Sequence, residues 1–388
     1  MRKLELEELH LEYGLFAALD AEELRSIAKR ITPEEEDLIR IEETQQLGLA
    51  NLSAYLTEPY LDVYVATSMR EDADFVSANS FVRRLFANGE VRDLNLRYFN
   101  PTQSWIEDRV SKGLVEALML RRSKVTVYMA QKSDTFGKDS EASVALGQGK
   151  TVIVYVPRLC DFGSHVNSEE IYRSEDRVLD EELKRLEIEI EEGLDKKAKA
   201  RQVLHAMLSR LPDEAITRIV FEHWADFDLY GELRNIQNEN LKSGCYGFLR
   251  TVRSAESPDM VVNPEGTVRA EFIDKLVAVA DAFESRARTF REVHPLSLQV
   301  IVRSGVVNGI LVTRSVESCA GILRGVLENT LRLEVVTEEE NYRLVEHDTQ
   351  STLRVVSRHH LLTNAFWSQY FEDAHKVVDS ELLEAATI

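Results

Sequence analysis

The chain has 388 residues and a formal net charge of −20, with 44% hydrophobic and 29% charged residues. This composition is typical of a soluble globular protein with two or three domains, and it excludes a low-complexity chain. The negative charge disfavours binding to nucleic acid. No apolar run is long enough to span a bilayer, and the charged N-terminal stretch lacks the apolar region of a signal peptide.

The cysteines and histidines predict neither disulfides nor a metal site. Cys160, Cys245 and Cys319 are odd in number and far apart, which is typical of free thiols in a reducing cytoplasm. His359 and His360 are adjacent, and neighbours on a strand point to opposite faces, so they chelate poorly. We therefore expect a cytoplasmic protein without a structural metal.

The first part of the chain predicts a helical lead-in followed by a strand. Residues 1–58 space their apolar side chains at three and four, which favours amphipathic helices that pack on the next domain. LDVYVATS (61–68) is an apolar run typical of a buried strand. Thr67, Ser68 and Arg70 come at its carboxyl end, where a helix cap with a surface arginine is the plain interpretation.

A helix with an apolar face follows, and Gly89 ends it. DLNLRYFNP (93–101) is predicted as the next strand, with Tyr98 and Asn100 near its end. An aromatic ring at this position can stack on a nucleobase or simply belong to the core. The next predicted helix spaces its apolar residues four apart, around Leu114.

The segment from Lys124 to Pro157 predicts strand, acidic loop, short helix and strand. Gly137 is interpreted as a turn glycine of the loop, and Asp139 or Ser140 as the cap of the helix. Glu141 then falls in the first helical turn, where the helix dipole favours an ionised carboxylate.

This placement has a chemical consequence for Glu141. Loops that leave the carboxyl ends of parallel strands open into the crevice where α/β sheets bind ligands. An ionised carboxylate there suits a nucleophile or a partner for developing positive charge. The alternative is that Glu141 is an ordinary acidic residue of a first helical turn.

A spaced pattern runs through this segment and ends in a hydrophobic strand: Asp134, Gly137, Glu141, Ala145, Gly149 and Lys150. With this pattern, the segment from Leu61 to Pro157 resembles the nucleoside 2-deoxyribosyltransferase family, including deoxyribosyltransferase-like anti-phage effectors. TIR-type NAD glycohydrolases are a more distant match. The resemblance implies that Glu141 attacks the sugar C1′ and displaces the base. Ser111, Lys112 and Gly113 stand where the family usually has a substrate-binding aspartate, which favours a relative with a different substrate or outcome.

The resemblance also implies roles for other residues. Thr67 and Ser68 are expected to hold a ribose or phosphate, Arg70 a phosphate, and Tyr98, Asn100 and Gly137 to line the substrate site. Asp134 or Asp139 is expected to bind ribose hydroxyls or to carry a proton. The implied activity is cleavage of an N-glycosidic bond in NAD, a nucleotide or a deoxynucleoside, by a hydrolase or a transferase. No cofactor is expected, with NAD as one substrate candidate.

The expected fold is α/β, with four domains or regions. A small parallel-sheet, Rossmann-like and deoxyribosyltransferase-like domain (61–160) follows the helical region 1–58. A charged helical region (165–230) and a mixed α+β C-terminal domain (231–388) complete the chain. Gly, Asn, Ser and Pro clusters make residues 229–266 the candidate for a domain boundary or an excursion. After them we expect a helix over 268–293 and short strands at LEVVTE, YRLVEH and TLRVVSR. Most of the chain lies outside the α/β domain, which favours a regulated, anti-phage-like effector that assembles with itself or with a protein partner through its helices. Two alternatives remain: a module that binds a nucleotide signal without cleaving it, and a structural or assembly protein.

Overall fold

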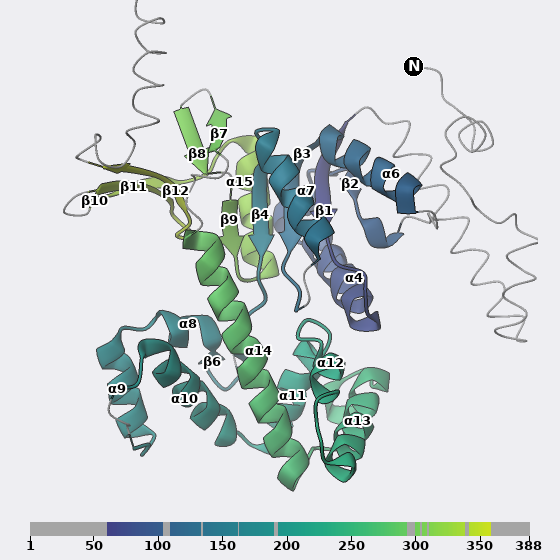
Figure 1. The fold of residues 1–388 in the computed structure, drawn as a ribbon, viewed down its shortest axis with the longest axis vertical. Helices are drawn as coiled ribbons and strands as arrows, with labels where there is room; N and C mark the ends of the chain where they lie inside the picture. Colours follow the sequence, from purple (N-terminus) through teal and green to yellow (C-terminus); the bar gives the residue numbers. More distant parts are fainter. Residues whose placement is uncertain are drawn as a thin grey trace, which may run out of the picture.

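The computed structural model shows a mixed α/β protein built around one parallel sheet (Figure 1). Asp134, His359, His360 and the predicted helical region 1–58 lie outside the described residues. The structure describes residues 60–103, 109–132, 135–161, 163–189, 193–292, 299–302, 305–308, 310–337 and 341–357.

The sheet has five strands in the order β2-β1-β3-β4-β9, and all neighbouring pairs are parallel. Four strands come from the segment predicted to form the sheet, and the fifth comes from more than 150 residues later. The strands are β1 (Leu61–Ala66), β2 (Tyr98–Phe99), β3 (Ser123–Met129), β4 (Thr151–Tyr155) and β9 (Ile310–Thr313). Helices cover both faces of the sheet, so side chains on both sides of each strand are buried. This burial explains why the strand sequences are mostly apolar.

Each face of the sheet buries its own hydrophobic cluster. One face is covered by α4 (Asp72–Ala87), α5 (Gly89–Arg92) and α15 (Val316–Glu328). The other is covered by α6 (Arg109–Arg122), α7 (Phe136–Gly147) and one end of α14 (Gly266–Glu292). The strand order reverses between β1 and β3, and the carboxyl ends of the strands at such a point form the ligand crevice of α/β sheets.

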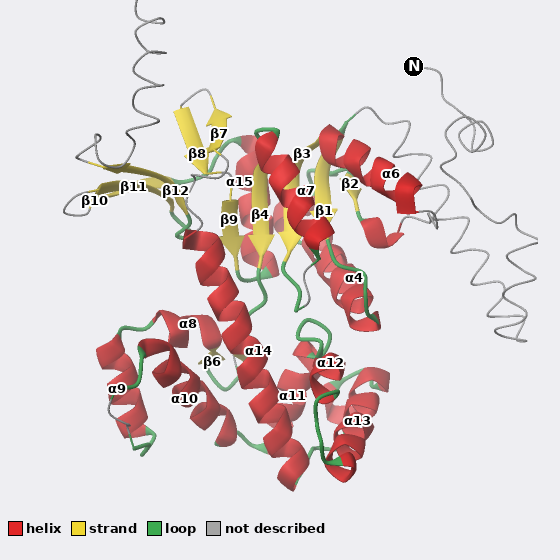
Figure 2. Cartoon of the chain, in the orientation of Figure 1, coloured by secondary structure: helices red, strands yellow, loops and turns green. Residues whose placement is uncertain are grey.

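A helical body is inserted in the chain between β4 and β9. It lies below the sheet in Figure 1, at the edge toward which the strand arrows point in Figure 2. Besides α14, its helices are α8 (Ser168–Arg173), α9 (Asp176–Arg185), α10 (Lys196–Ser209), α11 (Asp213–His223), α12 (Leu229–Leu233) and α13 (Glu239–Ser254). Residues 229–266, the expected domain boundary, include α12 and α13, and the buried side chains of α12, α13 and α14 share one core with α8 to α11.

The remaining strands form small antiparallel sheets. The predicted short strands near the C-terminal end are confirmed as β10 (Leu333–Thr337), β11 (Asn341–Glu346) and β12 (Thr352–Ser357). The two-stranded sheets consist of β5 (Cys160–Asp161) with β6 (Val166–Asn167), and of β7 (Gln299–Val302) with β8 (Gly305–Asn308).

Two local predictions need correction. The strand predicted over 93–101 is reduced to Tyr98–Phe99, and Gly89–Arg92 before it is helical. Helix α7 begins earlier than predicted because Thr135 caps it: its hydroxyl accepts a hydrogen bond from the Lys138 amide at 3.2 Å. Gly137 is therefore a helical residue, Asp139 lies in the first turn, and Glu141 lies in the second.

Within the described ranges, no helix is both long and apolar enough to cross a membrane. In the same ranges, no group of three or more His, Cys, Asp and Glu side chains is arranged to hold a metal ion. Cys160, Cys245 and Cys319 are free thiols, the first partly and the other two fully buried.

Candidate functional site

Glu141 lies on the sheet-facing side of α7 and is tied to the central strand β1. The Tyr64 hydroxyl donates a hydrogen bond to Glu141 Oε1 at 2.9 Å. Tyr64 is fully buried and points to the face that α6 and α7 cover. This contact joins residues 77 positions apart and fixes one carboxylate oxygen.

A second carboxylate, Glu116 of α6, acts on the same group. Burial raises the pKa of Glu141 to about 8, and the charge of Glu116 adds to this effect, while Tyr64, Lys138 and Lys112 oppose it. Burial also raises the pKa of Glu116, and Lys112 at 3.9 Å partly offsets it. Burial and Glu116 therefore favour the protonated form of Glu141, whereas its predicted place at a helix start favoured the ionised form.

The second oxygen of Glu141 has no assigned role within the fold. Oε2 is buried and has no hydrogen-bond partner among the described residues. The hydroxyl oxygens of Thr67 and Ser68, directly after β1, are also buried and have no hydrogen-bond partner among the described residues. Buried polar atoms nearly always have a partner, and leaving one without costs about 1–3 kcal/mol. A bound water or ligand is the usual partner of such atoms.

Asp139 and the first turn of α7 are fixed to the end of β3. Tyr128 donates a 2.6 Å hydrogen bond to Asp139 Oδ1. The buried Lys138 ammonium donates to the Met129 carbonyl at 2.7 Å and lies 4.7 Å from the centre of the Tyr128 ring. The contacts of Tyr128 and Lys138 hold Asp139 in place, so the structure supports a positioned carboxylate at this predicted site.

A network of hydrogen bonds fixes the backbone of the loop after β1. The Ser68 amide donates to Gln131 Oε1 at 2.5 Å, and Gln131 Nε2 donates to Asp74 Oδ1 at 3.2 Å. The Arg70 amide donates to Asp74 Oδ2 at 3.0 Å, while the Arg70 side chain is exposed. The network fixes the backbone where the strand order reverses, and it leaves the Arg70 guanidinium free to turn toward a ligand.

The other predicted substrate residues have structural contacts. The Tyr98 ring stacks on the Phe86 ring, with centroids 3.8 Å apart. Of the two predicted roles for Tyr98, this contact fits packing in the core and not stacking on a nucleobase. Asn100 is buried, donates to Asn79 Oδ1 at 3.2 Å and accepts from the Thr102 amide at 3.1 Å, which shapes the turn after β2. Gly137 is an exposed residue of α7.

Tyr64 and Glu116 were not among the residues predicted for the site. Tyr64 is one of several apolar letters in a strand, and its direction depends on the strand register. Glu116 interrupts the apolar face of α6 beside Val115 and Met119, which are buried. A carboxylate on an otherwise apolar helix face was the available indication.

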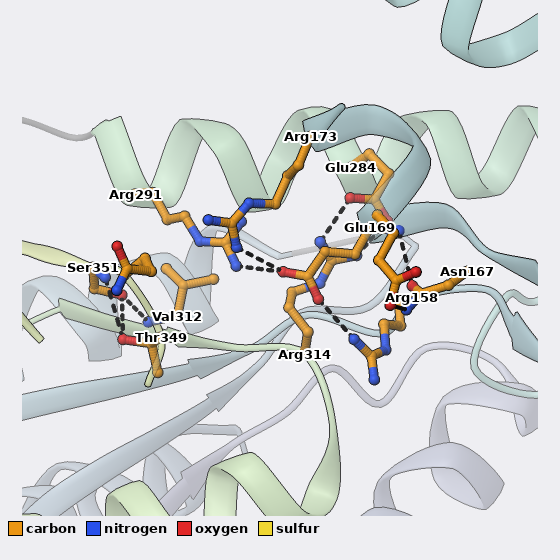
Figure 3. A network of polar contacts seen from close by, with 12 residues as sticks. Arg158, Asn167, Glu169, Arg173, Glu284, Arg291, Val312, Arg314, Thr349 and Ser351 are labelled. Atoms are coloured by element: carbon orange, nitrogen blue, oxygen red, sulfur yellow. Dashed lines mark hydrogen bonds and ion pairs between the residues drawn. The ribbon is translucent and has the colours of Figure 1, made fainter. Parts of the chain in front are cut away.

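A cavity of about 660 Å³ lies at the carboxyl ends of β4 and β9, away from Glu141 in the strand order. Its lining includes Arg158 after β4, Arg314 after β9, Arg173 on α8 and Arg291 on α14. Figure 3 shows these residues around Glu169 and Glu284. These arginines come from four separate segments of the chain, so no local sequence pattern predicts the cavity.

No protein-family model matches this chain, and searches of curated proteins and of solved structures found no significant similarity.

The Glu141 group combines two carboxylates, a buried phenol and a buried carboxylate oxygen without a partner among the described residues. The arginine cavity brings together four arginines and three carboxylates around a volume of about 660 Å³. The first arrangement suits acid–base or nucleophilic chemistry, and the second suits anion binding.

Proposed function

We propose that the protein cleaves the N-glycosidic bond of a nucleotide-type substrate, namely NAD, a nucleotide or a deoxynucleoside, with Glu141 as the nucleophilic carboxylate. In this proposal the five-stranded sheet is a Rossmann-like, nucleoside 2-deoxyribosyltransferase-like domain. The observation that carries it is the state of Glu141: Tyr64 holds Oε1, while the buried Oε2 has no partner among the described residues.

The proposed reaction has two steps. The first step starts from ionised Glu141: the bond between C1′ and the base nitrogen breaks, its electron pair leaves with the base, and Glu141 Oε2 forms a bond to C1′. A nucleobase takes up a proton from Glu116 as it leaves, whereas nicotinamide leaves NAD as a neutral molecule. Water then attacks C1′, the bond to Oε2 breaks, and the water proton passes to a carboxylate. Carboxylates serve sugar chemistry in this way because the transition state carries oxocarbenium-like positive charge.

The raised pKa of Glu141 supports selective stabilisation of that charge. In the empty site, burial and Glu116 favour the protonated form. A positive charge that develops at C1′ reverses this preference, so Glu141 interacts more strongly with the transition state than with a neutral ground state. Glu116 is the second carboxylate of the proposed site, and its raised pKa suits a proton donor to the departing base.

We also propose that the activity is regulated, as in anti-phage effectors of the cytoplasm. The helical body, inserted between β4 and β9, lies against the edge of the sheet where ligands bind (Figure 1). Arg234 before α13 pairs with Glu71 at 2.7 Å, and Asp226 accepts from Ser77 at 2.5 Å, so the helical body contacts the start of α4. A movement of that body therefore reaches the loop after β1.

The test is release of free base from NAD, NADP, ribonucleotides, deoxynucleotides and deoxynucleosides, read by mass spectrometry. Glu141→Gln keeps the size of the side chain and removes its charge, and Glu256→Gln changes an exposed glutamate as the matched control. We expect release by the wild-type protein and by Glu256→Gln, and loss of roughly 100-fold or more in Glu141→Gln.

Equal release by wild type and Glu141→Gln would reject Glu141 as the nucleophile. Binding of an intact nucleotide without release, also in lysate from phage-challenged cells, would reject cleavage and establish the nucleotide-binding alternative. If none of these compounds changes the melting temperature and none is cleaved, the structural or assembly alternative holds.

A further inference from the structure

The four-arginine cavity is the strongest unexplained feature outside the Glu141 group. Three of its arginines surround one carboxylate: Glu169 accepts from Arg158 at 2.8 Å and from Arg291 at 2.7 Å, and Arg173 lies at 3.6 Å. Figure 3 shows Arg158 and Arg291 reaching Glu169 from different directions. The lining also carries Glu170 and Asp348, so its four arginines outnumber its three carboxylates by one. Asp348 pairs with Arg332 outside the cavity at 2.6 Å, and Glu170 accepts from Asn167 at 2.8 Å.

The fourth arginine of the lining, Arg314, is buried, and its hydrogen bonds are all made within the fold. Arg314 is only 4% exposed and binds both oxygens of Glu284, at 2.5 and 2.7 Å. Its remaining donors reach the carbonyls of Val156 and Pro157. This neutral pair is therefore structural, and Arg158, Arg173 and Arg291 are the arginines that remain to contact a ligand.

Donors remain for a ligand. A guanidinium has five N–H groups, and the contacts to Glu169 use only some of those on Arg158 and Arg291. Arg291 Nε is buried without a hydrogen-bond partner among the described residues. Burial lowers the pKa of Arg291, Glu169 opposes this, and the neighbouring Arg314 and Arg173 add to the lowering. An anion here would offset both the burial and the neighbouring charges of Arg314 and Arg173.

The cavity also lies beside the amino end of a helix, a position where proteins often bind anions. Ser315 caps α15 directly after β9, so the amino end of this 13-residue helix faces the carboxyl end of the strand. About 660 Å³ exceeds the needs of a single inorganic phosphate and lies within the range of small-molecule pockets. Planar guanidinium groups bind phosphate oxygens in pairs, which favours a ligand with several phosphates.

We infer that this cavity binds a small molecule that carries two or more phosphates, at a site separate from Glu141. The lining joins three parts of the molecule: Arg158 of the sheet, Arg173 and Arg291 of the helical body, and Thr349 of the turn before β12. A bound polyphosphate group bridges these parts and stabilises their arrangement. The inference does not depend on the proposed cleavage, because β3 and β4 separate β1 from β9 in the sheet.

The experiment measures binding of inorganic tripolyphosphate to the full chain by calorimetry and thermal unfolding at constant ionic strength. Tripolyphosphate has no N-glycosidic bond, so its binding is independent of any activity at Glu141. Arg173→Gln is the main variant, because Arg173 is 51% exposed and its loss leaves the contacts of Glu169 to Arg158 and Arg291 in place. Arg158→Gln is the second variant. Arg177→Gln, which changes an exposed arginine of α9 outside the cavity, is the control.

We expect saturable binding with a raised melting temperature in the wild type and in Arg177→Gln. In Arg173→Gln and Arg158→Gln the Kd should rise roughly tenfold or more, since each variant removes a charge-assisted contact. Absence of saturable binding at millimolar tripolyphosphate would overturn the inference. Equal stabilisation of all four proteins would also overturn it, because it would reflect the general effect of such anions on protein surfaces.

Adenosine triphosphate and adenosine identify the source of the phosphates. Tighter binding of the nucleotide than of tripolyphosphate, lost in Arg173→Gln, assigns the site to nucleotides, and equal binding assigns it to inorganic polyphosphate. Adenosine alone should not respond to Arg173→Gln. A response of adenosine equal to that of the nucleotide would contradict recognition through phosphates.

Discussion

The hydroxyl of Tyr64 on β1 donates a 2.9 Å hydrogen bond to Glu141 Oε1 on α7. Because Tyr64 is fully buried, its phenol cannot turn to water, and the carboxylate is held in one orientation. The hydrogen bond favours the ionised form of Glu141, while burial and Glu116 favour the neutral form more strongly. The pH response of the proposed site follows from this balance.

Activity should rise with pH through about 8. The nucleophile must be ionised, and the raised pKa of Glu141 delays ionisation, so kcat/KM for base release should increase until Glu141 has lost its proton. Tyr64→Phe removes the hydrogen bond that favours the charge, so its midpoint should move to higher pH. A pH series of kcat/KM for the two proteins measures both. A midpoint that Tyr64→Phe leaves unchanged would contradict this role of Tyr64.

The stability of the wild type relative to Glu141→Gln should fall with pH. Between the ordinary pKa of Glu141 near 4.5 and its folded value of about 8, the folded chain binds more protons than the unfolded chain. The free energy of unfolding therefore decreases across this window, by an amount on the order of a few kcal/mol, and Gln does not titrate. Urea unfolding of both proteins at pH 5 and pH 9 measures the change. A difference that stays constant between these pH values would show that Glu141 has an ordinary pKa.

Glu284→Gln should destabilise the fold by roughly 3–5 kcal/mol, because it leaves the buried Arg314 guanidinium without its anion. Glu284 also accepts a 2.6 Å hydrogen bond from Ser168, so the change affects α8, α14 and the end of β9 together. Chemical denaturation gives the loss. The double variant Arg314→Met with Glu284→Leu is the control and should lose less, since it removes both charges. A larger loss in the double variant would mean that the ion pair itself is the main stabilising contribution.

Thr135→Ala should cost about 1 kcal/mol of stability, because it removes the side-chain cap of α7. Thr135→Ser keeps the oxygen that accepts from the Lys138 amide and should remain close to the wild type. Thermal unfolding compares the three proteins. Equal losses in both variants would assign the effect to the lost methyl group and not to the cap.

Local patterns in the sequence determined the parts of this protein whose structure depends on neighbouring residues. The apolar runs that became β1, β3 and β4, the short strands near the C-terminal end, and the helix around α14 follow from strand and helix periodicity, which is a local property. The presence of an acidic residue on the helix between β3 and β4 was equally visible. Its place in that helix was not, because the cap at Thr135 starts α7 before Gly137.

Only the tertiary structure decided which distant segments meet. It brought β9 beside β4, turned Tyr64 toward Glu141, set Glu116 against the same carboxylate, and gathered four arginines from four segments around Glu169 and Glu284. These contacts depend on strand register and on which faces are buried together, and neither is written in a window of adjacent residues. The residues of both proposed sites meet through such contacts, so the sequence indicated an acidic residue and the fold defined its surroundings.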